Sequence, residues 1–101
     1  MATHDMFLAM ILTNARREEA RALTLTVAAQ KSSIEMTLAD GTARTLSAPP
    51  PEVLTRIIEN LAGGQTLFES SVFSVTVETV KLQREAGRLS ACIFGWTIEH
   101  R

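Results

Sequence analysis

The side chains best suited to catalysis or metal binding in this chain are one thiol and two imidazoles. Cys92 lies in an apolar run, while His4 and His100 stand near the two ends of the 101 residues. A thiol nucleophile needs a neighbouring base and a lowered pKa, and a metal site needs several converging ligands. Within a predicted strand, a thiol usually packs as a small apolar side chain. An enzyme using Cys92 is therefore an alternative that requires a histidine beside the thiol, and neither a metal site nor a cofactor is expected.

Two further groups of residues fall short of catalytic motifs. Glu18 and Glu19 are adjacent in a predicted helix, so their carboxylates diverge instead of working as a pair. The run Gly63-Gly64-Gln65-Thr66 lacks both the spacing and the lysine of a phosphate-binding loop. The chain is therefore predicted not to be an enzyme and not to hydrolyse nucleotides.

Trp96 is the one large aromatic residue with a polar handle in the chain. It follows Gly95 in a predicted strand, where a single tryptophan is expected to belong to the core. If Trp96 instead lined a pocket with converging polar groups, the chain would be a small-ligand-sensing domain. This is the first alternative to a binding role.

Composition excludes several classes of protein. With 46% hydrophobic and 21% charged residues, the chain is predicted to form a single domain over residues 1–101. A net charge of −1 gives no overall attraction to nucleic acid. A single cysteine fits a reducing compartment, and the apolar run from Met6 to Leu12 is too short to span a bilayer and lacks the basic flank of a signal peptide. We expect a cytoplasmic protein with no membrane insertion.

Hydrophobic periodicity predicts the elements that must position these residues. A helix is expected from about Asp5 to Ala22, with Phe7, Met10, Ile11 and Asn14 or Ala15 buried. A strand follows over residues 23–28, and the polar residues 30–33 form a turn.

The segment from Met36 to Gly64 predicts a hairpin followed by a helix. Apolar residues alternate at Ile34, Met36 and Leu38, and a three-residue loop with Gly41 at positive φ would place Ile34 opposite Leu46. Three prolines then end the strand. A helix over Glu52 to Ala62, stopped by Gly63-Gly64, buries a set of regularly spaced residues: Val53, Leu54, Ile57, Ile58 and Leu61.

The last predicted element is a long hairpin in which residues 72–83 pair with residues 88–99 through a four-residue loop. Under that register the apolar face changes sides midway. A bulge near Glu78-Thr79 would correct the change. Without a bulge, an aliphatic patch is exposed on the distal half and predicts a partner interface formed by Val80, Leu82, Leu89, Ala91 and Ile93.

Together these elements predict an α+β fold, specifically a two-layer α/β sandwich in the order α-β-β-β-α-β-β. The sheet is expected to be largely antiparallel, with both helices on one face.

Over residues 7–94 the chain resembles the small PAS-like domain that precedes the motor in ATPases of type II secretion and type IV pilus assembly. The residues that carry the resemblance are Asp40-Gly41 with Arg44 and Leu46, Pro49-Pro50-Pro51, the helix from Glu52 to Ala62, Gly63, and the strand Phe73 to Val77. Where the family has Ala-Ser-Asp-Ile-His, this chain has Ala20-Arg21-Ala22-Leu23-Thr24. The resemblance implies an adaptor-like module without the motor.

The leading functional hypothesis is non-catalytic protein binding, in secretion or pilus-type machinery, with a protein partner or as a homodimer. A PAS-like small-ligand sensor and a small thiol-dependent enzyme remain the alternatives. The sequence identifies neither the partner nor a ligand.

Overall fold

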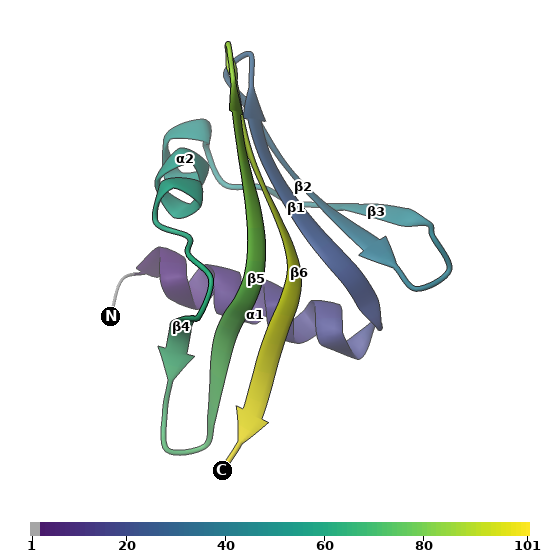
Figure 1. Ribbon diagram of the computed structural model, residues 1–101, viewed down its shortest axis with the longest axis vertical. Coiled ribbons are helices and arrows are strands. Elements are labelled where there is room, and N and C mark those ends of the chain that lie inside the picture. Colours follow the sequence, from purple (N-terminus) through teal and green to yellow (C-terminus); the bar gives the residue numbers. More distant parts are fainter. Residues whose placement is uncertain (1–2) are drawn as a thin grey trace.

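The computed structural model describes residues 3–101, with side-chain surroundings from Met6 onward. Two helices and six strands follow one another as α1 (Thr3–Arg17), β1 (Ala20–Ala28), β2 (Lys31–Leu38), β3 (Ala43–Leu46), α2 (Pro51–Glu59), β4 (Gln65–Glu69), β5 (Phe73–Glu85) and β6 (Arg88–His100). The strands form one antiparallel sheet in the order β3-β2-β1-β6-β5-β4 (Figure 1).

The predicted two-layer α/β sandwich, in the order α-β-β-β-α-β-β with both helices on one face, is wrong. More than half of the residues lie in a single six-stranded sheet, to which the two helices are a minor addition. The prediction missed β4, whose five residues are too few to display a period of two. A bulge between Thr66 and Phe68 also breaks the alternation of its side chains.

α1 is shorter than predicted, and its buried face matches the prediction only in part: Ala15 is buried, and Phe7 and Ile11 are half-buried against the core. It ends at Arg17 because Glu19 adopts a left-handed φ of 58° and turns the chain into β1. The buried side chains are Leu8, Ala9, Leu12 and Ala15, whereas Met10 and Asn14 are exposed. Residues 6–12 are apolar without interruption, so the first two turns have no polar side from which a buried face could be deduced.

The hairpin of β2 and β3 has the predicted register. Gly41 has a φ of +90°, and the Leu38 amide donates to the Thr42 carbonyl oxygen over 2.8 Å. The Thr42 hydroxyl and amide both donate to the Asp40 carboxylate, which lowers the pKa of Asp40. Before this hairpin, the turn from β1 to β2 is tighter than predicted, with positive φ at Ala29 and Gln30.

α2 buries the predicted face. Leu54, Ile57 and Ile58 are buried, Leu61 just beyond the helix is 5% exposed, and Arg56 faces solvent. The helix begins after Pro50 and ends at Glu59, three residues earlier than predicted. It packs mainly against β1 and β6.

The hairpin of β5 and β6 differs from the prediction in loop length and register. A two-residue loop at Ala86-Gly87 replaces the four-residue loop, so Val77 pairs with Trp96. The register shifts on both sides of Thr79, first on β5 and then on β6. These compensating bulges keep Val77, Val80, Ile93 and Trp96 on the same face of the sheet.

The sheet divides along the length of β6. Residues 88–93 of β6 pair with β1, but β1 then diverges, and the rest of β6 pairs with β5 alone (Figure 1). The C-terminal part of α1 approaches this division, where the Arg16 guanidinium donates to the Trp96 carbonyl oxygen. Within the described residues, neither helix is long and apolar enough to cross a membrane.

Candidate functional site

The predicted interface on the outer half of the β5–β6 hairpin requires the apolar face to change sides midway. The two bulges keep the apolar side chains on one face instead. Ala91 and Ile93 are 0% exposed and belong to the core, so neither can contact a partner. Val80 and Leu89 are half-buried against the same core, and Leu82 is 48% exposed. The expectation that these five side chains lie opposite Val75 and Val77 is therefore wrong.

Cys92 has no catalytic surroundings among the described side chains. It is half-buried on β6, and the Thr24 hydroxyl lies 3.7 Å from its sulfur. His100 is eight residues further along the same strand, about 26 Å away at the usual rise. The side chain of His4 lies outside the described residues. Within the described part of the chain, no three potential ligands gather into a metal site.

Three clefts lie beside α1. One cleft, of about 330 Å³, runs between α1 and the strands β4 and β5. It is lined by Met6, Ala9, Met10, Thr13, Asn14, Arg17, Phe68 and Phe73. Because Met10 is 61% and Met6 44% exposed, this cleft carries an apolar surface open to solvent. We call it the α1 cleft.

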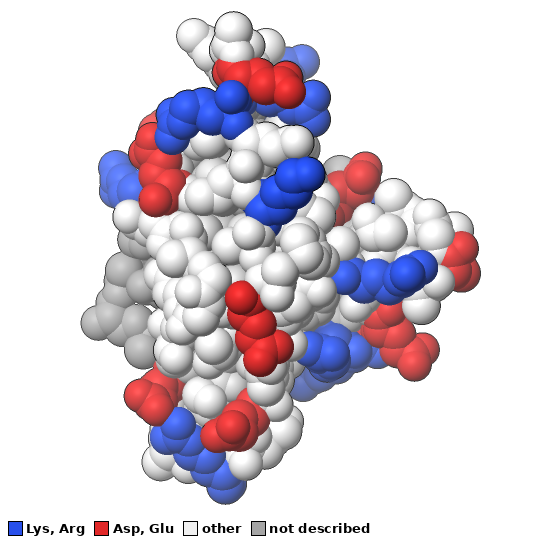
Figure 2. All heavy atoms as spheres, in the orientation of Figure 1, with Lys and Arg blue, Asp and Glu red and all other residues white. Residues whose placement is uncertain are grey.

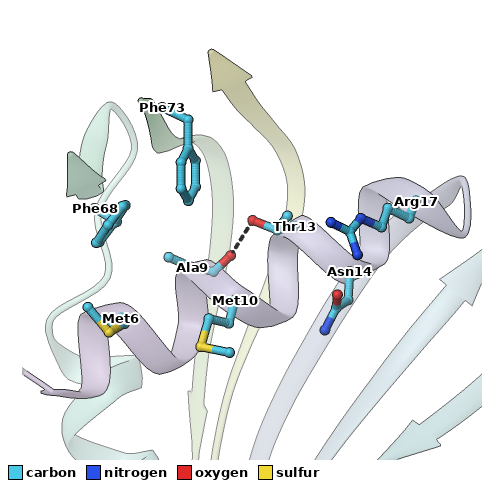
Figure 3. A pocket seen from close by; sticks show the side chains of 8 residues that line it. All are labelled: Met6, Ala9, Met10, Thr13, Asn14, Arg17, Phe68 and Phe73. Atoms are coloured by element: carbon cyan, nitrogen blue, oxygen red, sulfur yellow. Dashed lines mark hydrogen bonds between the residues drawn. The ribbon is translucent and has the colours of Figure 1, made fainter. Parts of the chain in front are cut away.

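The walls of the α1 cleft come from elements far apart in the sequence. Phe68 of β4 and Phe73 of β5 form an aromatic pair with ring centroids 5.0 Å apart, and Figure 3 shows them beside the N-terminal half of α1. Asn14 and Arg17 stand at the opposite end of the cleft from Met6 (Figure 3). The Thr13 hydroxyl donates to the Ala9 carbonyl oxygen over 2.8 Å. The cleft is therefore apolar at one end and cationic at the other.

A second cleft, of about 520 Å³, lies where α1 meets the second half of β6. It is lined by Thr13, Arg16, Arg17, Trp96, Thr97, Ile98 and His100, and we call it the β6 cleft. The Trp96 indole N–H donates to the Leu12 carbonyl oxygen over 3.1 Å, and the Arg16 guanidinium lies 5.1 Å from the centroid of the Trp96 rings. Trp96 thus fixes the position of α1 on the sheet.

A third cleft, of about 360 Å³, lies on the side of α1 that faces β2 and β3 and includes Phe7, Ile11, Met36 and Leu46. Arg17 borders all three clefts. By contrast, the side of β5 and β6 turned toward the viewer in Figure 2 carries few charges near its middle, and the charged side chains gather toward its ends. These three clefts therefore all lie along α1.

Sequence reasoning missed the α1 cleft because it placed Met10 in the core and left β4 unassigned. The available signal was the pair Met6 and Met10, one helical turn apart, together with Phe68 in a short run that favours strands. No family model, curated protein or solved structure matches this chain.

Proposed function

We propose that this chain is a non-catalytic, cytoplasmic protein-binding module, and that it binds its partner in the α1 cleft. The observation that carries the proposal is the exposure of Met6 and Met10 beside the partly buried Phe68 and Phe73. Methionine side chains are flexible and polarizable, so such a surface adapts to apolar side chains of a partner. Contiguous apolar surface of this kind commonly marks an interaction site.

An amphipathic helix is the occupant that suits the α1 cleft. The cleft follows α1 from Met6 to Arg17, a distance of about 16 Å at the helical rise. An apolar helical stripe can lie in such a groove, with anchors at intervals of three and four residues. The Arg17 guanidinium at the cationic end favours a carboxylate on the partner, two turns from its apolar anchors. The resemblance to the domain of secretion and pilus ATPases supports a partner within that kind of assembly.

The test is selection of helical peptides on the intact protein from a display library. We expect enriched peptides to combine apolar residues at helical spacing with an acidic residue near one end. Met10→Glu should weaken their binding at least tenfold, because it introduces a charge into the apolar part of the cleft. Fluorescence anisotropy with the labelled peptides measures the change.

Leu82→Glu is the matched control, since it places the same charge on an exposed apolar residue of the distal hairpin. Peptide binding should be unaffected by this substitution. Equal effects of the two substitutions, or the absence of enriched peptides, would overturn the proposed site. A dimer in solution that Met10→Glu converts to a monomer would show that the occupant is a second copy of the chain.

Small-ligand sensing has weaker support. Trp96 does line the β6 cleft, together with polar groups. However, its indole N–H and the Arg16 guanidinium already have partners within the chain, and the space beneath the helices holds core side chains such as Leu12, Leu25 and Ile58. Protein binding therefore remains the proposed function.

A further inference from the structure

The second half of β6 has an open backbone edge, although β6 is an inner strand of the sheet. Among the described strands, residues 95–100 of β6 pair with β5 on one side and with none on the other. Open strand edges attract further strands, and proteins usually cover or shorten them. This half-edge lies beside the β6 cleft, which includes Trp96, Ile98 and His100.

The backbone groups of alternate residues point to the open side. The Arg101 amide donates to the Val72 carbonyl oxygen over 2.7 Å, so the backbone groups of Arg101 point toward the β5 side of β6. The Trp96 carbonyl oxygen accepts from Arg16 of α1 and therefore faces away from β5. In an antiparallel strand the N–H and C=O of one residue share a side, and the sides alternate. Trp96, Ile98 and His100 thus present their backbone groups to the open edge.

Two guanidinium groups lie beside this edge, because Arg16 and Arg17 come from the last turn of α1 and line the β6 cleft. Among the described side chains, no carboxylate lines the β6 cleft. We propose that the half-edge of β6 binds an extended acidic segment of a partner protein, which adds to the sheet as a strand beside residues 96–100.

The alternation of donors and acceptors favours a peptide over a small anion. A single carboxylate can accept hydrogen bonds but offers no N–H to the carbonyl oxygens of Ile98 and His100, whereas a peptide backbone supplies both. Every second side chain of the added strand would face the cleft, so carboxylates should recur at alternate positions. One of these carboxylates can form an ion pair with the Arg16 guanidinium. A peptide amide then donates to the Trp96 carbonyl oxygen in place of Arg16.

The experiment uses a labelled eight-residue peptide of alternating Glu and Val with the full chain, read by fluorescence anisotropy. Two further peptides carry N-methyl groups on alternate residues, one at the Glu and one at the Val positions. All three have the same charge. Because only one set of amides can face β6, we expect one methylated peptide to lose at least tenfold in affinity and the other to lose much less. Arg17→Gln should also weaken the unmodified peptide at least tenfold.

Arg56→Gln, which removes an exposed arginine from α2, is the control and should leave binding unchanged. Met10→Glu should also leave it unchanged, which separates this site from the α1 cleft. Equal binding of both methylated peptides would overturn strand addition and indicate attraction by charge alone. Undetectable binding of the unmodified peptide, or its displacement by equimolar free glutarate, would also overturn the proposal.

Discussion

At the scale of single residues, the β5–β6 hairpin depends on the close approach of Gly95 and Thr79. The two residues are paired between the compensating bulges, and a Cβ atom built on Gly95 would lie 2.9 Å from the Thr79 hydroxyl oxygen and 3.1 Å from its Cβ. Only glycine fits this contact without movement. The bulges on either side of this contact place Val77 and Val80 on one face although they are three positions apart.

Gly95→Ala is therefore expected to destabilise the protein by about 1–3 kcal/mol through overpacking against Thr79. Chemical denaturation of the wild-type protein and of Gly95→Ala at the same temperature measures the loss in the free energy of unfolding. Combining Gly95→Ala with Thr79→Gly should recover part of it, because the opposing Cβ and hydroxyl are removed. Additive losses in the double variant would contradict the proposed contact.

The contrast between Gly41 and Gly95 shows which residues sequence reasoning can interpret. Gly41 belongs to an Asp-Gly turn whose chemistry is local, and its positive φ was predicted correctly. Gly95 is explained by a residue sixteen positions away, and its pairing depends on the register of the whole hairpin. The sequence indicated that a bulge near Glu78-Thr79 was possible but could not decide between a bulge and an exposed patch.

At the scale of elements, the two helices show how well a buried face can be predicted. In α2 the polar residues Glu52, Arg56 and Glu59 mark one side, so the buried face was predicted correctly. In α1 the apolar residues surround the first turns, and Met10, which is exposed in the α1 cleft, was assigned to the buried face. The apolar residues on every side of these turns make the cleft apolar, and they also hide which side of α1 is buried. The candidate site was missed for this reason.

Ile57→Ala should destabilise the protein by about 2–5 kcal/mol, because Ile57 is 2% exposed and its truncation leaves a cavity between α2 and the sheet. Arg56→Ala alters the neighbouring exposed position and should change stability by less than about 0.5 kcal/mol. Thermal unfolding followed by circular dichroism compares the two. Similar losses from both substitutions would show that the buried face of α2 is assigned incorrectly.

At the scale of the whole molecule, α1 separates two surfaces of different chemistry. The α1 cleft offers apolar side chains next to β4, an edge of the sheet, whereas the β6 cleft offers cations next to an open half-edge. The two proposed partners, an amphipathic helix and an acidic strand, occupy different clefts, but both would use Arg17, which borders both clefts.

The prediction for the whole molecule is that it does not hydrolyse ATP. A phosphate-binding loop leads from a strand into the N-terminus of a helix and carries a lysine. Here Gly63 and Gly64 follow α2 and lead into β4, so the order is reversed, and the residues directly after them are Gln65 and Thr66 instead of a lysine. Purified protein with ATP and Mg²⁺ should release phosphate at the rate of the buffer alone, and the double variant Gly63→Ala with Gly64→Ala should give the same rate. Phosphate release that follows the protein through successive purification steps and falls in this variant would contradict the non-catalytic function.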